Sequence, residues 1–177
     1  DIVITTTGEI ATKGDTAAGI DAVTKGDEAT ITISVGGDIS TVDDYSAGVS
    51  ARTVAGDLTI TGKADIATQG KQATGIAALI TKDDDVDVKV TWTGDITTAG
   101  EQAYGIRSST QGNQSDIVIT FTGDLTTTGK DGDAIIASTD GTYSALTITT
   151  TGDILTKGAD AQGVNAFVFA DKGVLKI

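Results

Sequence analysis

Gly152-Asp153-Ile154-Leu155-Thr156, continued by Ala161-Gln162-Gly163-Val164-Asn165-Ala166, is the stretch that decides the fold, because its pattern returns throughout the chain. The six copies begin at Gly8, Gly37, Ala64, Gly94, Gly123 and Gly152. Successive copies are 29, 27, 30, 29 and 29 residues apart (37−8, 64−37, 94−64, 123−94, 152−123). A near-constant period of this length is typical of stacked structural repeats. We therefore expect residues 1–177 to form a single elongated domain.

Each repeat contains three short segments in which apolar residues alternate with polar ones. We call the part of each copy that corresponds to residues 152–156 the head, and the part that corresponds to residues 161–166 the tail. The first segment precedes the head, and its inward column reads Ile4, Ile33, Ile60, Val90, Ile119 and Ile148. The head supplies Ile10, Ile39, Ile66, Ile96, Leu125 and Ile154, and the tail supplies Ile20, Val49, Ile76, Ile106, Ile135 and Val164. Alternation with β-branched residues predicts half-buried strands, and no segment has the apolar spacing of a helix. The pattern predicts an all-β, right-handed parallel β-helix of about six coils, its handedness following the general preference of parallel connections.

Two further columns are expected at the corners between strands. Threonine follows each head at Thr12, Thr41, Thr68, Thr98, Thr127 and Thr156. We expect each hydroxyl to bond a backbone group of the corner, because an unpaired buried hydroxyl costs about 1–3 kcal/mol. Glycine precedes the tail at Gly19, Gly48, Gly75, Gly105 and Gly163, with Ala134 as the exception. We expect these glycines to take a conformation that is closed to side chains.

Composition excludes several classes of function. The net charge is −13, which argues against binding to nucleic acid or to anionic lipid. The chain has no histidine and no cysteine, so the commonest general base and the thiolate metal ligands are missing. No run of about 18 apolar residues is present, so we expect no membrane insertion of this segment.

Acidic residues recur as a complete column, at Glu9, Asp38, Asp65, Asp95, Asp124 and Asp153. One interpretation is a ladder of calcium ions, and the other is a turn residue that accepts its own backbone N–H. A denser acidic run lies at the corner where repeat length varies, and it comprises Asp83, Asp84, Asp85 and Asp87. These four residues are weak candidates for calcium ligands, and a solvated loop is the favoured interpretation. We predict no cofactor, with calcium as the alternative.

Threonines also form pairs on the outward side of the strand before each head. The clean pairs are Thr91/Thr93, Thr120/Thr122 and Thr149/Thr151, whereas Gly36 and Lys63 interrupt the array in earlier repeats. Such a face resembles the surface of ice-binding β-solenoids, and we regard it as a candidate binding face. Threonine is also simply a good residue for a solvent-facing strand.

The remaining aromatic and basic residues suggest no catalytic centre. Trp92 and Phe121 share an inward column, so we expect a stacked core pair, with a sugar platform as the alternative. Tyr45 and Tyr104 lie near a corner, where we expect them exposed and able to contact a glycan or a partner. A polysaccharide-active β-helix enzyme remains a second alternative. It needs clustered acids and a basic residue, but the acids recur evenly, and Arg52 and Arg107 lie in different repeats. We predict no catalytic residues.

The segment Gly94-Asp95-Ile96-Thr97-Thr98-Ala99-Gly100-Glu101-Gln102-Ala103-Tyr104-Gly105-Ile106 carries a resemblance to a known family. Its pattern resembles the passenger repeats of bacterial autotransporters, the type V secretion proteins, and the resemblance covers the whole chain. It implies a passenger β-helix that projects from the cell surface, commonly as an adhesin involved in aggregation or biofilm. In that family a signal peptide and a C-terminal outer-membrane barrel flank the passenger, and this chain shows neither. The resemblance implies no shared catalytic residues.

These observations predict a non-catalytic, extracellular rod that serves as a stalk or an adhesin at a bacterial surface. Val174-Leu175-Lys176-Ile177 matches the opening of a further strand, so the chain begins and stops in nearly the same phase of the repeat. We expect either a piece of a longer solenoid or end-to-end stacking of copies into a fibre.

Overall fold

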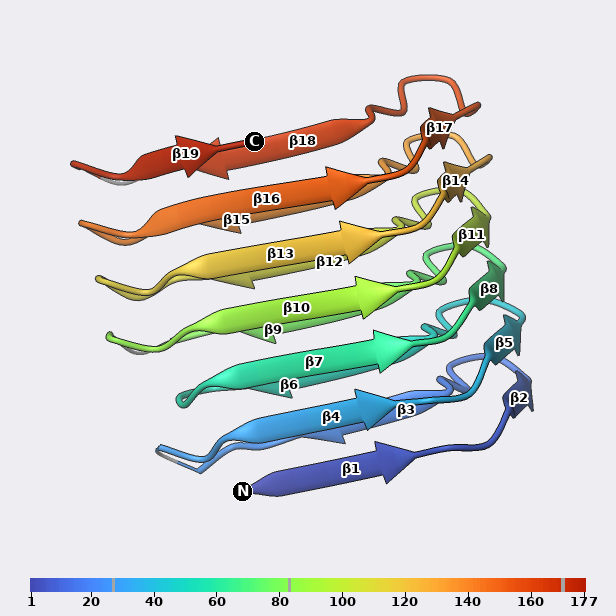
Figure 1. Cartoon of the computed structure of the whole chain (residues 1–177), viewed down its shortest axis with the longest axis horizontal. Coiled ribbons are helices and arrows are strands. Elements are labelled where there is room, and N and C mark those ends of the chain that lie inside the picture. Colours follow the sequence, from blue (N-terminus) through green and yellow to red (C-terminus); the bar gives the residue numbers. More distant parts are fainter. Residues whose placement is uncertain (27, 83, 170) are drawn as a thin grey trace.

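The protein is a stack of coils built from β-strands, as the computed structural model shows (Figure 1). The structure describes residues 1–26, 28–82, 84–169 and 171–177. These residues contain 19 strands in three parallel sheets and no helix. In Figure 1 each coil crosses the front from left to right, turns back, returns behind and rises, which makes the solenoid right-handed. The predicted parallel β-helix of about six coils is confirmed.

Each coil contributes one strand to each sheet. Sheet A contains β1 (Ile2–Thr6), β4 (Ile31–Val35), β7 (Leu58–Lys63), β10 (Val88–Thr93), β13 (Ile117–Thr122), β16 (Ala145–Thr151) and β19 (Val174–Lys176). Sheet B contains β2 (Ile10–Lys13), β5 (Ile39–Val42), β8 (Ile66–Gln69), β11 (Ile96–Ala99), β14 (Leu125–Thr127) and β17 (Ile154–Thr156). Sheet C contains β3 (Ile20–Val23), β6 (Val49–Thr53), β9 (Ile76–Ile80), β12 (Ile106–Thr110), β15 (Ile135–Thr139) and β18 (Val164–Val168).

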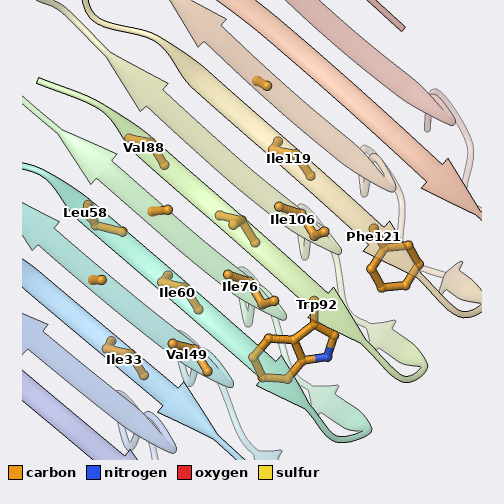
Figure 2. Packing of buried hydrophobic residues seen from close by; sticks show 14 of the residues in the cluster. Ile33, Val49, Leu58, Ile60, Ile76, Val88, Trp92, Ile106, Ile119 and Phe121 are labelled. Atoms are coloured by element: carbon orange, nitrogen blue, oxygen red, sulfur yellow. The ribbon is translucent and has the colours of Figure 1, made fainter.

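The register of the sheets places equivalent repeat positions directly above one another. In sheet A, Ile60 pairs with Ile33 on one side and with Val90 on the other. All three side chains are fully buried, and the aliphatic columns of the three sheets meet in one core. Figure 2 shows part of this core, in which Ile33, Ile60 and Ile119 lie on the sheet A strands β4, β7 and β13, and Val49 and Ile76 lie on sheet C strands. A repeat of nearly constant length therefore converts sequence columns into continuous apolar ladders.

The threonine column closes the corner between sheets B and C. Five of the six hydroxyls, those of Thr12, Thr41, Thr68, Thr98 and Thr127, donate to the backbone carbonyl five residues further along the chain. The distances are 2.5 Å from Thr41 to Ser46 and 2.8 Å from Thr98 to Ala103. Thr98 is fully buried, so this bond satisfies a hydroxyl that water cannot reach. The expectation of a bond between the hydroxyl and the corner backbone is confirmed.

The glycines before the tail at Gly19, Gly48, Gly75 and Gly105 exclude side chains for a different reason from the expected one, whereas a Cβ on Gly163 would make only an ordinary contact. A Cβ on Gly48 would lie 2.6 Å from Cγ2 of Ile66 and 2.7 Å from the carbonyl oxygen of Gly75 in the next coil. Its φ lies outside the left-handed region, so close approach of the next coil, and not backbone conformation, requires glycine here. Left-handed φ angles occur instead at twelve non-glycine residues among those described, and six of them hold the equivalent position in the corner between sheets B and C. These six are Thr16, Tyr45, Gln72, Gln102, Asp131 and Asp160, with φ between 55° and 60°.

The two large aromatic side chains of the inward column lie in the core. Trp92 and Phe121 are register partners in sheet A, and each is 1% exposed (Figure 2). The indole N–H of Trp92 donates to the backbone carbonyl of Ala64 at 2.9 Å, which satisfies its polar group. The expected core position is confirmed, and a sugar platform on these rings is wrong. Among the described residues, the stacked pair of rings is Phe167 and Phe169, whose centroids are 5.5 Å apart, and not the expected pair of Trp92 and Phe121.

Candidate functional site

The repeated carboxylates have a structural role at the corner between sheets A and B. Oδ1 of Asp95 accepts a hydrogen bond from the backbone N–H of Asp124 in the next coil at 2.8 Å, and Oδ1 of Asp65 accepts one from the N–H of Asp95 at the same distance. The same contact joins Asp38 to Asp65 and Asp124 to Asp153. The carboxylate thus serves as the acceptor for a backbone N–H of the next coil, in place of the backbone carbonyl that a strand would offer. The interpretation that the carboxylates accept backbone N–H groups at a turn is correct. The expected partner is wrong, because the N–H belongs to the next coil and not to the same turn.

The denser acidic run behaves in the same way where the structure describes it. Oδ1 of Asp84 accepts from the N–H of Asn113 at 2.7 Å, and Oδ1 of Asp87 accepts from the N–H of Asp116 at 2.9 Å. Asp85 has a left-handed φ of 60° in the turn, and Asp83 lies outside the described residues. Among the described residues, no group of three or more acidic side chains is placed to hold a metal ion. Repeat length varies at this corner, since β9 ends at Ile80 and β10 begins at Val88.

The threonine pairs form two straight ladders on the outer face of sheet A. Thr120 pairs with Thr91 and Thr149, and Thr122 pairs with Thr93 and Thr151. The structure therefore brings all six predicted residues together on one face, with Thr93, Thr122, Thr149 and Thr151 exposed and the other two half-buried. The ladders present hydroxyls without a charged group between them, and Lys63 replaces threonine beside Thr93 in the preceding coil.

The outer face of sheet C, which we call the sheet C face, does not follow the repeat. One outward column on this face reads Asp21, Ser50, Ala77, Arg107, Ile136 and Asn165. The equivalent column of sheet B reads Ala11, Ser40, Ala67, Thr97, Thr126 and Leu155. Stacking of coils does not require the changes in size and charge seen on the sheet C face, so this face is free to carry a specific contact.

A polar hollow lies on this face at the corner with sheet B. It has a volume of about 200 Å³, and its lining residues, which we call the Arg107 hollow, are Gln72, Thr74, Gln102, Tyr104 and Arg107. The guanidinium carbon of Arg107 lies 6.0 Å from the centroid of the Tyr104 ring, within cation–π range. Nε2 of Gln72 donates to Oε1 of Gln102 at 3.0 Å across two coils. Both glutamines line the hollow and have left-handed φ angles of 56°.

The charges around the hollow leave one cation without an acidic partner. Among the described residues, ion pairs join Arg52 to Asp21 at 3.6 Å, Lys71 to Glu101 at 3.4 Å and Lys130 to Asp131 at 3.5 Å. None of these pairs includes Arg107, although its side chain is exposed. A wider groove of about 510 Å³ shares Gln72, Thr74 and Arg107 with the hollow and runs along the face past Arg52 and Tyr45. The hollow and the groove are therefore continuous.

Sequence reasoning found this site only in part. Tyr45 is 53% exposed as expected, but Tyr104 is half-buried beside Arg107. The two arginines do lie in different coils, on β6 and β12, yet they share one face and one groove. Gln72 and Gln102 were not predicted as site residues. Parity could have placed Arg107 on the outer face, because a residue one place after an inward isoleucine of the tail must face outward, but it gives no signal for the two corner glutamines.

Comparisons of the chain with protein-family models, with curated proteins and with solved structures returned no match. Within the part of the chain that the structure describes, no helix is long and apolar enough to cross a membrane.

Proposed function

We propose that the chain is a non-catalytic, adhesive rod of a bacterial cell surface, of the kind that forms autotransporter passengers. The observation that carries the proposal is the difference between the three outer faces. The outward columns of sheets A and B consist mainly of threonine, serine, alanine and valine. The sheet C face instead carries both arginines, Tyr45 and the Arg107 hollow. A rigid scaffold with one irregular polar face suits display of contacts along its length.

The use of the carboxylates supports a non-catalytic role. A glycosidase-type mechanism needs two carboxyl groups free to act as acid and base or nucleophile. Here Asp65, Asp95 and Asp87 each accept a backbone N–H of the next coil, so their placement is explained by the stacking of coils. The resemblance of the repeats to autotransporter passengers supports an extracellular location and a role in adhesion or biofilm.

Adhesion is tested with microspheres that carry the covalently attached chain, applied to a printed panel of bacterial and mammalian surface polysaccharides. We expect retention on at least one polysaccharide, well above the retention of microspheres that carry the same chain after irreversible heat unfolding. Equal retention of the two kinds of microsphere across the panel would remove the adhesive role.

End-to-end association of copies is also part of the proposal. Sedimentation and negative-stain microscopy of the folded chain, with and without millimolar calcium, measure it directly. Filaments one solenoid wide are the expected result for a fibre subunit, and short single rods at all concentrations contradict it.

Ice binding is a second candidate function, favoured by the threonine ladders on sheet A. Thr91, Thr120 and Thr149 are in register at the ~4.8 Å spacing of parallel strands, and the second ladder runs two residues away. Thermal hysteresis at micromolar concentration, abolished by Thr120→Lys, is the expected result. An unchanged freezing point of solutions of the folded chain, beyond the colligative effect, contradicts this candidate.

A further inference from the structure

We propose that the Arg107 hollow binds the carboxylate of a uronic acid residue in an acidic polysaccharide, with the neighbouring sugars in the groove towards Arg52. This inference rests on the proposed adhesive function and names the class of ligand that the rod would hold.

The first argument is the unused binding capacity of Arg107. Its guanidinium offers five N–H donors in a planar fork that matches the two oxygens of a carboxylate. It belongs to none of the described ion pairs, while Glu101, the acid next to Gln102 in the chain, is paired with Lys71. Most lysines are also outside these ion pairs, so Arg107 is distinguished by its position in a polar hollow. The ring of Tyr104 lies beside it and orients the guanidinium.

The second argument is the chemistry of the other lining groups. The Gln72–Gln102 bond uses one amide donor and one amide acceptor, which leaves a donor and an acceptor at its two ends. Thr74 adds a hydroxyl at the floor, where its residue is only 6% exposed, and Tyr104 adds a phenol. This set of amide, hydroxyl and phenol groups matches a ligand that is rich in hydroxyls.

The third argument selects a polysaccharide over an acidic peptide. Peptides commonly bind to sheets by adding a strand at an open edge, but β6, β9, β12 and β15 are paired on both sides. The hollow lacks an apolar pit for an anchoring side chain, and the groove continues along the rod for further polar contacts. Arg52 lies on this groove in an exposed pair with Asp21, which is weak and can exchange partners.

The test is calorimetric titration of the folded chain with tetragalacturonate, with its fully methyl-esterified form, with maltotetraose and with a tetraglutamate peptide. We expect tetragalacturonate to bind, and the ester and maltotetraose to bind at least about tenfold more weakly, because both lack the charge. Binding should also weaken with added salt. Equal affinity for the acid and its ester overturns the proposal, as does tetraglutamate binding that is as tight or tighter. The proposal is also overturned if none of the four probes, at millimolar concentration, gives a heat of binding or competes with another probe.

Matched variants locate the site. Arg107→Gln should weaken tetragalacturonate binding about tenfold or more, and Arg107→Lys should weaken it less. Lys89→Gln removes the same charge from the outer face of sheet A and should leave binding within about twofold. Equal losses in the two glutamine variants would mean a diffuse charge effect and would contradict the site. Far-UV circular dichroism checks that all variants are folded.

The two proposals fail in distinguishable ways. If microspheres that carry Arg107→Gln adhere to the polysaccharide panel as well as microspheres that carry the parent chain, the adhesive function is supported and the Arg107 site is contradicted. Microspheres that adhere to nothing would remove the adhesive function itself.

Discussion

The indole ring of Trp92 occupies the space that a side chain at position 62 would need. Gly62 and Trp92 are register partners on β7 and β10, and a Cβ built on Gly62 would lie 2.1 Å from Cζ3 of the ring. Val35 and Phe121 fill the same column on the coils on either side. The large side chain of one coil is thus accommodated by the missing side chain of its neighbour, which is how close packing is kept in a column of unequal volumes.

Gly62→Val should therefore destabilise the fold, by about 3 kcal/mol in the free energy of unfolding, because the new side chain must displace the indole. Trp92→Val should also destabilise it, by leaving a cavity and an unpaired carbonyl at Ala64. The double variant should lose clearly less than the sum of the two, and urea unfolding of all four proteins measures this coupling. Thr150→Val, in the exposed end of the same column, is the matched control and should be near neutral. Additive losses would show that the two positions do not compete for space.

Ser108→Ala should stabilise the protein. Ser108 lies in the inward column that otherwise holds Ala22, Ala51, Ala78, Ala137 and Ala166. Its hydroxyl oxygen is buried without a hydrogen-bond partner. Removing a hydroxyl that lost its water on folding should raise the free energy of unfolding by about 1 kcal/mol, measured by urea unfolding. Ser109, its half-buried neighbour on the outward side of the same strand, supplies the control Ser109→Ala, which should change little. A loss of stability in Ser108→Ala would mean that the hydroxyl has a partner.

The carboxylate of Asp95 should act through its hydrogen bond to the next coil and not through calcium. Asp95→Ala removes the acceptor for the N–H of Asp124 and should cost about 1 kcal/mol. Asp95→Asn keeps an acceptor oxygen in place and should retain stability. Thermal unfolding with millimolar calcium and with a chelator should give the same midpoint for the parent chain. A calcium-dependent midpoint that Asp95→Asn abolishes would instead establish a metal ladder.

Asp87→Asn should stabilise the protein at neutral pH and not at acidic pH. Burial raises the pKa of the Asp87 carboxyl above its ordinary value of 3.8. The hydrogen bond from the N–H of Asp116 opposes the rise in this pKa, and the carboxylates of Asp116, Asp57 and Asp85 add to it. A raised pKa means that the folded state holds the proton more tightly than the unfolded state. This contribution to stability is full below pH 3.8 and is lost as pH rises through the folded pKa.

Asparagine cannot ionise, so the variant avoids that loss. Its advantage over the parent in the free energy of unfolding should grow as pH rises above 3.8 and then level off. The advantage will be small, because the carboxylate is partly solvated. Urea unfolding between pH 3 and pH 7 measures it, with Asp87→Ala as the control that also loses the acceptor for Asp116. A difference between Asp87→Asn and the parent that does not vary with pH contradicts the raised pKa.

The sequence predicted most of the fold because each apolar column reports one place on every coil. Ile33, Ile60 and Val90 occupy the same repeat position, and the structure pairs them in adjacent strands. The partner of Thr98 was predictable as well, since a buried hydroxyl beside a turn has few acceptors other than the corner backbone. The role of Gly48 was not, because its constraint comes from atoms of Ile66 and Gly75 in the next coil.

The candidate site could be predicted less well, because it lies where the repeat is broken. Each coil has a different residue type in the column of Arg107, so the column has no periodicity that could report the site. Its position beside Tyr104 depends on the corner, and the neighbouring Gln72–Gln102 bond joins residues 30 positions apart. The left-handed conformation of both glutamines had no signal in residue type, since glycine is the residue usually associated with it.

By itself the sequence determined the repeat, the three parallel sheets and the side of each strand that faces the core, because period and parity are properties of the chain alone. Only the tertiary structure decided which backbone N–H each aspartate accepts, which glycine accommodates Trp92 and which polar side chains converge on Arg107. The physical reason is that these contacts join different coils. Their geometry depends on how one coil settles on the next, to within fractions of an ångström that no residue pattern encodes.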